Sequence, residues 1–161
     1  MASRAILFLD VDGTLLPFGG PGTPPAPGVT ASSNPYLARI DRTLGPLLAA
    51  LECDLVWATA WMDDANEVIA PLLGLPQLPV ADLPGQDGDD GADRLQWKTK
   101  ALIRIAAGRP FVWVDDDIGP ADRWWVELEH PGEALLHRVE PAVGLTAADV
   151  ALIATWLVKH S

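Results

Sequence analysis

The sequence predicts an α/β protein built on a three-layer, Rossmann-like parallel sheet of about five strands. Two observations predict this fold class. Short apolar runs bounded by turn residues recur along the chain, and segments with helical periodicity lie between them. Strands that alternate with helices imply right-handed crossovers and a mostly parallel sheet covered on both faces. The expected strands are residues 5–9, 54–58, 78–80, 111–114 and 134–139.

The first of these runs, residues 5–9, is continuously apolar and is followed by Asp10 and Gly13, which is typical of a strand buried on both faces. The second and fourth runs have the same character. The run at 78–80 is short and is weakened by its proline. The run at 134–139 alternates more between apolar and polar residues, so we expect it at an edge of the sheet.

Helical periodicity fills the intervals between the strands. Asp63 and Thr146 are plausible N-caps, and Gly74 and Gly108 are plausible stops. The expected helices are residues 36–51, 63–73, 98–107, 121–128 and 146–160.

The chain length fits one domain that covers residues 1–161. With 49% hydrophobic and 20% charged residues, the chain is too apolar for a disordered protein. Two segments stand outside the alternation of strands and helices. Residues 17–35 form a Pro/Gly-rich flap loop, and residues 84–93 form an acidic loop, for which a solvated loop is favoured over a calcium site.

The formal net charge of -11 weighs against tight binding of long nucleic acids or anionic membranes. No apolar stretch near the N-terminus is long enough for a signal sequence or a membrane span. We therefore expect a cytoplasmic protein without a membrane partner.

Paired aspartates follow the first strand. Asp10 and Asp12 are two residues apart, so both carboxylates face the same way at the carboxyl end of the strand, where open α/β sheets place their ligands. Gly13 lets the backbone turn sharply and approach a bound anion closely. A simple turn would explain one aspartate after such an apolar run but gives no reason for two.

A second acidic cluster, Asp115 to Asp117, follows the fourth expected strand. Parallel strands bring both clusters to one edge of the sheet. Several carboxylates within a few ångströms repel one another, and a hard divalent cation such as Mg²⁺ relieves that repulsion. Helix capping is an alternative that would account for one of these aspartates.

Thr59 closes the second expected strand, and Lys98 opens the helix before the fourth. Neither residue is informative alone. In the order Asp10-x-Asp12-Gly-Thr14, Thr59, Lys98 and Asp115-Asp116, however, the sequence resembles the haloacid dehalogenase-like (HAD) superfamily over nearly its whole length.

Within that superfamily the chain is similar to the small, nearly capless HAD domain of Swiss Army Knife RNA-repair proteins. The residues that carry this likeness are Trp57-Ala-Thr-x-Trp61, Asn66, Trp97-Lys98 and Val112-Trp-Val-Asp-Asp116.

The resemblance implies a phosphatase with a covalent intermediate. Asp10 is the implied nucleophile that forms an aspartyl phosphate. Asp12 is the implied general acid and base, and its presence favours phosphoryl transfer over dehalogenation. Thr59 is implied to bind a phosphoryl oxygen, and Lys98 to neutralise developing charge.

The resemblance also implies a Mg²⁺ site formed by Asp10, the Asp12 backbone carbonyl, and Asp115 or Asp116. Two ambiguities remain open in the sequence. Lys100 could exchange roles with Lys98, and Asp117 could replace one of the paired metal ligands.

Gly13, Thr14 and Trp61 are candidate substrate-binding residues. Trp61 lies just beyond a strand end, where an aromatic ring could stack on a base or sugar. The implied substrate is a phosphorylated small molecule or a nucleic-acid phosphate end, such as a nucleotide. Without a cap, the site admits a bulky substrate or is closed by a partner subunit, which leaves a homo-oligomer open.

Two alternatives to a phosphatase remain at this point. A phosphotransferase or mutase shares every catalytic residue. A receiver-like phospho-aspartate signalling module also combines acidic residues, threonine and lysine around Mg²⁺, but its motifs come in a different order along the chain.

Overall fold

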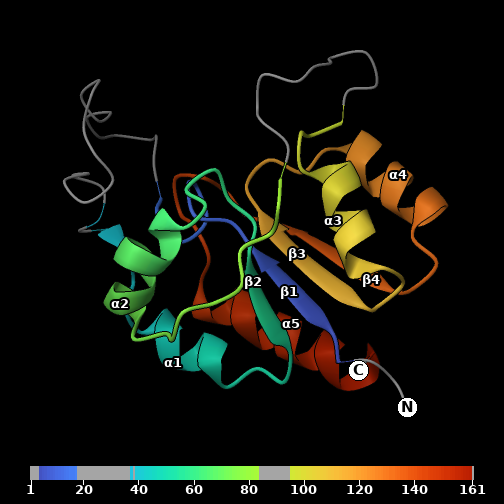
Figure 1. The fold of residues 1–161 in the computed structure, drawn as a ribbon. Coiled ribbons are helices and arrows are strands. Elements are labelled where there is room, and N and C mark those ends of the chain that lie inside the picture. Colours follow the sequence, from blue (N-terminus) through green and yellow to red (C-terminus); the bar gives the residue numbers. More distant parts are fainter. Residues whose placement is uncertain (1–3, 18–36, 38, 84–94, 161) are drawn as a thin grey trace.

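The computed structural model describes residues 4–17, 37, 39–83 and 95–160 and confirms the α/β fold class. Four parallel strands form a central sheet in the order β2–β1–β3–β4 (Figure 1). The strands are β1 (Ile6–Leu9), β2 (Asp54–Trp57), β3 (Phe111–Asp115) and β4 (Ala134–Arg138).

Burial of the strands follows their position in the sheet. The two central strands, β1 and β3, are buried throughout, whereas β2 and β4 at the edges are partly exposed. Leu9 of β1 pairs with Trp57 on one side and Val114 on the other. The carboxyl ends of the three strands are therefore level, and the residues that follow them meet at one edge.

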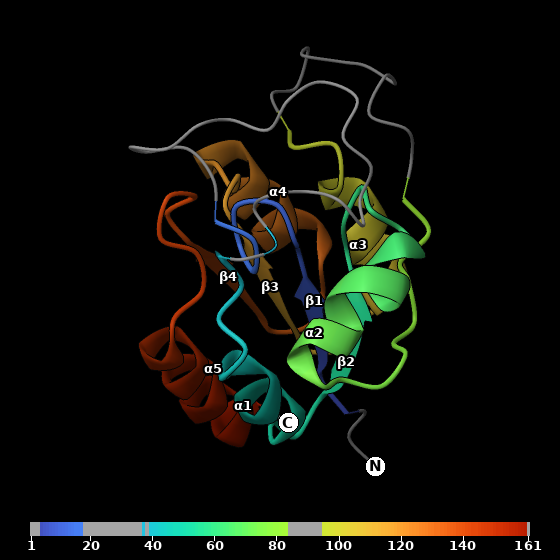
Figure 2. The same cartoon turned by 90° about the vertical axis from the view of Figure 1, so that its left-hand side faces the viewer.

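Two helical layers cover the sheet (Figures 1 and 2). One apolar core joins Leu7 and Leu9 of β1 to α1 (Leu44–Ala49), α2 (Ala70–Leu73) and α5 (Ala147–His160). The alternate β1 residues, Ile6 and Phe8, pack with α3 (Thr99–Ala106) and α4 (Pro120–Glu129) on the opposite face. Because successive strand residues point to opposite faces, the continuous apolar run of β1 serves both layers.

The expectation of about five strands was wrong by one. Residues 78–80 form an isolated bridge, Val80 with Trp57, beside β2 rather than a strand. Prolines at positions 76 and 79 have no N–H to donate to a ladder, which limits pairing to this single point.

The first two expected helices differ from the structure. Instead of a helix over 36–51, the described residues of this range form an α-helix only in α1, in which Pro46 occupies the first turn. The segment 63–73 is split into a π-helical turn, η3 (Ala65–Ile69), and α2. Pro71 cannot donate the N–H that would continue an α-helix through this point. Asp63 is not the N-cap, because η3 begins after Asp64.

The other helices lie close to their expected positions. Gly74 ends α2 in the left-handed conformation with φ of 73°, and Gly108 follows α3 with φ of 87°. Thr146 caps α5, since its hydroxyl accepts a hydrogen bond from the Asp149 backbone N–H at 3.2 Å.

The predicted flap loop at 17–35, apart from Pro17, and the predicted acidic loop at 84–93 lie outside the described residues. Within the described part of the chain, the helices are all too short or too polar to cross a membrane.

Candidate active site

Three aspartates gather at the carboxyl edge of the sheet. Asp10 follows β1, and Asp115 and Asp116 end and follow β3. One carboxylate oxygen from each lies within 4.8 Å of the others. Asp10 is 5% exposed and Asp115 is 1% exposed, whereas Asp116 is half-buried. The structure thus brings together the two acidic clusters that the sequence placed at strand ends.

Lys98 neutralises part of this charge from the start of α3. Its Nζ lies 2.8 Å from Asp10 Oδ1 and 2.8 Å from Asp115 Oδ2, and the side chain is buried. Lys100 is exposed, and its Nζ lies 5.0 Å from the centre of the Trp125 ring. Of the two lysines, Lys98 is therefore the one that faces the acidic cluster.

Burial and like charge shift the pKa values of the acids in the cluster. Burial raises the pKa of Asp10 well above 3.8, Lys98 opposes this shift, and Asp115 adds to it. Burial and Asp115 raise the pKa of Asp116 to about 6. Burial alone would lower the pKa of Lys98, but attraction to Asp10 and Asp115 outweighs it and raises the pKa, so the ammonium stays charged.

The turn after β1 places the remaining residues of the first motif. Gly13 adopts the left-handed conformation with φ of 78°, which turns the chain back toward the site. Thr14 is buried, and its Oγ1 donates a hydrogen bond to Asp10 Oδ2 at 3.0 Å. Asp12 stays exposed at the mouth of the site. The Thr14 hydrogen bond fixes the orientation of Asp10. The expected contact of Thr14 with the substrate stays a prediction.

The segment after β2 lies beside Asp12. The indole Nε1 of Trp61 donates to Asp12 Oδ1 at 3.0 Å. Thr59 is buried at the same sheet edge, and its Oγ1 accepts a hydrogen bond from the Trp61 backbone N–H at 3.1 Å. Within the described residues, no hydrogen bond joins Thr59 to Asp10.

Gln96 and Asp122 support the site and were not predicted from the sequence. Gln96 donates from Nε2 to Asp115 Oδ2 at 3.1 Å and accepts from the Lys98 backbone N–H at 2.8 Å. Buried Asp122 accepts hydrogen bonds from the Gln96 backbone N–H at 2.7 Å and from the Thr99 hydroxyl at 2.6 Å. These contacts fix the segment that carries Lys98.

Asp122 also ties this segment to α4. Its Oδ2 accepts from the Gly119 backbone N–H at 2.9 Å, which caps the start of that helix. Nothing in the sequence marks Gln96 as a residue of the site. Asp122, in contrast, occupies the first helical turn after Gly119-Pro120, the pattern of an N-terminal capping residue.

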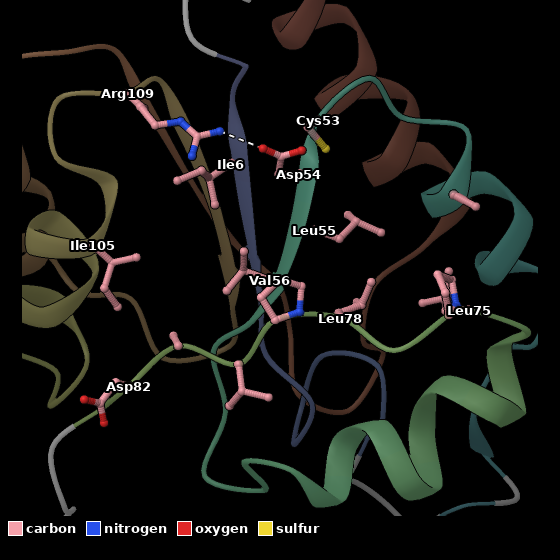
Figure 3. A pocket seen from close by; sticks show the side chains of 15 residues that line it. Ile6, Cys53, Asp54, Leu55, Val56, Leu75, Leu78, Asp82, Ile105 and Arg109 are labelled. Atoms are coloured by element: carbon pink, nitrogen blue, oxygen red, sulfur yellow. Dashed lines mark hydrogen bonds and ion pairs between the residues drawn. The ribbon is translucent and has the colours of Figure 1, made fainter.

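The cluster opens into a hollow of about 180 Å³, whose lining includes Asp10, Asp12, Trp97, Lys98 and Asp116. A larger groove of about 560 Å³ runs along the β2 edge (Figure 3). Its walls are mainly apolar, and an ion pair between Arg109 and Asp54 lies at one end. Its lining contains no member of the acidic cluster, so the smaller hollow is the site of interest.

The donor set fits a magnesium ion. Asp10, Asp115 and Asp116 offer carboxylate oxygens, the ligands that hard divalent cations prefer. Among the described residues, Lys98 is the ammonium group paired with these carboxylates. Asp117 is exposed and belongs to no such group of oxygens among the described residues, which favours Asp115 and Asp116 as the pair.

Together, the parallel sheet and an acid–lysine cluster at its carboxyl edge define a protein of the HAD class. The chain belongs to the family described as the HAD domain in Swiss Army Knife RNA repair proteins, whose model matches residues 6–150. HAD domains are generally hydrolytic, which supports a hydrolase of the phosphatase type.

A solved structure supports the fold independently. The HAD domain of the effector protein Lem4 from Legionella pneumophila superposes with a TM-score of 0.58 at 14% sequence identity. The match covers 98% of this chain and 95% of that one. At this identity the likeness shows the fold alone. The search of curated proteins found no match.

Proposed function

We propose that the chain is a Mg²⁺-dependent phosphatase that hydrolyses a phosphomonoester through an aspartyl phosphate on Asp10. The observation that carries this proposal is the environment of Asp10. Its two oxygens are held by Lys98 and Thr14, beside the carboxylates of Asp115 and Asp116. A carboxylate fixed in this way at a sheet edge is oriented for attack on phosphorus.

Asp12 is the proposed general acid and base. In the first step an oxygen of Asp10 bonds to phosphorus, the ester P–O bond breaks, and the proton of the Asp12 carboxyl passes to the leaving alkoxide. In the second step water attacks phosphorus, gives its proton to Asp12, and the bond from phosphorus to Asp10 breaks. Partial removal of the carboxyl group from water raises the pKa of Asp12 above 3.8 and outweighs the Trp61 hydrogen bond and the charge of Lys98, which lower it. The raised pKa favours the protonated form that the first step needs.

The residues that would hold Mg²⁺ are Asp10, Asp115, Asp116 and the backbone carbonyl of Asp12. When bound, the ion supplies positive charge that stabilises the transferring phosphoryl group. Lys98 supplies a second positive charge beside Asp10. Thr59 is the proposed hydroxyl donor to a phosphoryl oxygen, because it is buried at the same sheet edge.

A nucleotide or a short nucleic-acid phosphate end is the proposed substrate. The family description names RNA repair proteins, which supports a phosphate carried by a nucleotide. Trp97 lines the hollow, and Trp61 contacts Asp12 at its mouth, so aromatic surface lies next to the reacting groups. The net charge of -11 favours a short substrate over a long one.

The test is phosphate release, with added Mg²⁺, from nucleotides, sugar phosphates and oligonucleotides with 3′- or 5′-phosphate ends. We expect Asp10→Asn to abolish turnover and Asp12→Asn to lower it by roughly 10²–10⁴-fold. Exposed Asp82→Asn, in the wall of the other groove, is the matched control and should leave the rate unchanged.

Free inorganic phosphate as the product distinguishes a phosphatase from a mutase, which passes the group to a second alcohol. Turnover of Asp10→Asn at the wild-type rate would contradict the mechanism. Inactivity on every nucleotide and oligonucleotide, with activity on sugar phosphates, would contradict the proposed substrate class alone.

A further inference from the structure

Trp61 contacts Asp12, the proposed general acid, directly. Its indole Nε1 donates to Asp12 Oδ1 at 3.0 Å, and this bond joins segments 49 residues apart in the chain. We propose that Trp61 is a positioning residue that orients Asp12 for proton transfer. This inference rests on the proposed phosphatase function, and it adds a second role to the stacking surface already proposed for Trp61.

The turn that carries Trp61 is held at several points. The backbone N–H of Trp61 donates to Thr59 Oγ1 at 3.1 Å, and its carbonyl accepts from the Asp64 N–H at 3.0 Å. Met62 follows in the left-handed region with φ of 51°, a conformation that a side chain with a Cβ rarely adopts. A strained residue between such bonds indicates that the local structure dictates the turn. The indole is therefore presented to Asp12 in a defined position.

The chemistry of the indole suits an acid that changes its protonation state. The indole N–H is a donor only, so it fixes Asp12 Oδ1 as an acceptor. Oδ1 can accept this bond whether Asp12 is a carboxylate or a carboxylic acid with its proton on Oδ2. Among the described residues, no hydrogen bond reaches Oδ2. The contact thus assigns Oδ2 as the oxygen that gives its proton to the leaving group and later takes one from water.

This assignment separates Trp61 from a residue that only binds substrate. If Trp61 acts through Asp12, removing Trp61 should lower the rate most for esters whose leaving group needs a proton. A stacking residue would affect all esters of one shape equally. Phenyl phosphate and 4-nitrophenyl phosphate are such a pair, since both present a benzene ring but phenolate is the more basic leaving group.

The experiment measures kcat/KM for both esters with Mg²⁺, because this constant reports the step that forms the aspartyl phosphate. Trp61→Phe keeps an aromatic ring and removes the donor. We expect it to lower kcat/KM for phenyl phosphate by roughly tenfold and for 4-nitrophenyl phosphate by less than about twofold. Trp124→Phe is the matched control, because Trp124 is 61% exposed on α4, and it should leave both constants unchanged.

A double variant provides the second readout. In the Asp12→Asn background, Trp61→Phe should cost no further activity, because residues that act as one unit are not additive. Equal losses on both esters, or the same loss with and without Asp12, would overturn the positioning role. Inactivity of the wild-type protein on both esters would contradict the proposed function itself, and the inference with it.

Discussion

Replacing Lys98 by methionine tests whether the buried ammonium holds the acidic cluster together. Methionine keeps a similar length and removes the charge. Lys98 Nζ has two carboxylate partners at 2.8 Å, and the side chain is 4% exposed. Removing one partner of a buried ion pair costs about 3–5 kcal/mol, since the other charge is left uncompensated. Without Mg²⁺ we expect Lys98→Met to lower the free energy of unfolding by about 3 kcal/mol, the low end of this range. The loss stays at the low end because the acids can take up protons in place of the lost cation.

The loss of stability should depend on pH, and its sign follows from the acids. Burial raises the pKa of Asp10 well above 3.8 and that of Asp116 to about 6, so ionising them destabilises the fold as pH rises. Lys98 offsets this effect, and its raised pKa keeps it charged throughout the neutral range. The difference between Lys98→Met and the wild type should therefore be larger at pH 8 than at pH 5.

The assay is urea unfolding at both pH values, with and without Mg²⁺, read as the free energy of unfolding. Lys100→Met is the matched control, and loss of its contact with the Trp125 ring should cost less than about 1 kcal/mol. Mg²⁺ should restore part of the stability of Lys98→Met, because the proposed metal site uses the same carboxylates. Equal stability of the two variants at pH 8 would refute the role assigned to Lys98.

Two further substitutions test the supports of the site and of the fold. Asp122→Asn should lower the free energy of unfolding by about 2 kcal/mol, because the amide offers one oxygen to the three donors that Asp122 now accepts from. Urea unfolding measures this loss, and unchanged stability would contradict the prediction. Asp149→Ala should cost about 1 kcal/mol at pH 7, since it removes the acceptor for Thr146 and His137. These hydrogen bonds hold the pKa of Asp149 below 3.8 despite its partial burial, so its contribution is present above about pH 4 and disappears as pH falls further. A cost that stays constant down to pH 2 in the same unfolding assay would contradict this assignment.

The strand ends were the most predictable part of the molecule. A continuous apolar run followed by aspartates constrains both burial and position, so β1 and β3 and the acids after them follow from the sequence. The adjacency of these two strands is a matter of topology. The sequence analysis did not predict it, because no single apolar run indicates its neighbour in the sheet.

The false strand at 78–80 shows the limit of apolar patterning. Leu78 and Val80 have the composition of a strand, but the prolines around them leave too few donors for a ladder. The backbone of Leu78 is held instead by the side chain of Asn66, which accepts from its N–H and donates to its carbonyl at 2.8 Å each. A side chain 12 residues away thus replaces a strand partner, and local sequence carries no sign of that.

Contacts between side chains of distant segments were equally hidden. Gln96 and Trp61 act on Asp115 and Asp12, respectively, across loops whose geometry depends on the whole sheet. Sequence reasoning places a residue near a strand end with fair accuracy. The sequence does not show which neighbouring acceptor a donor will bond, because that depends on distances of a few tenths of an ångström.

The charge of the site explains why the fold and the proposed chemistry depend on each other. In the described part of the chain, three carboxylates gather around the ammonium of Lys98, which already pairs with two of them. A phosphomonoester adds further negative charge to a partly enclosed hollow, where such charge is weakly screened. The described residues alone would therefore repel the substrate. In the proposed function, a divalent cation bound to these acids would remove that repulsion. The acidity that lowers the stability of the fold is then the property that the proposed phosphatase chemistry needs.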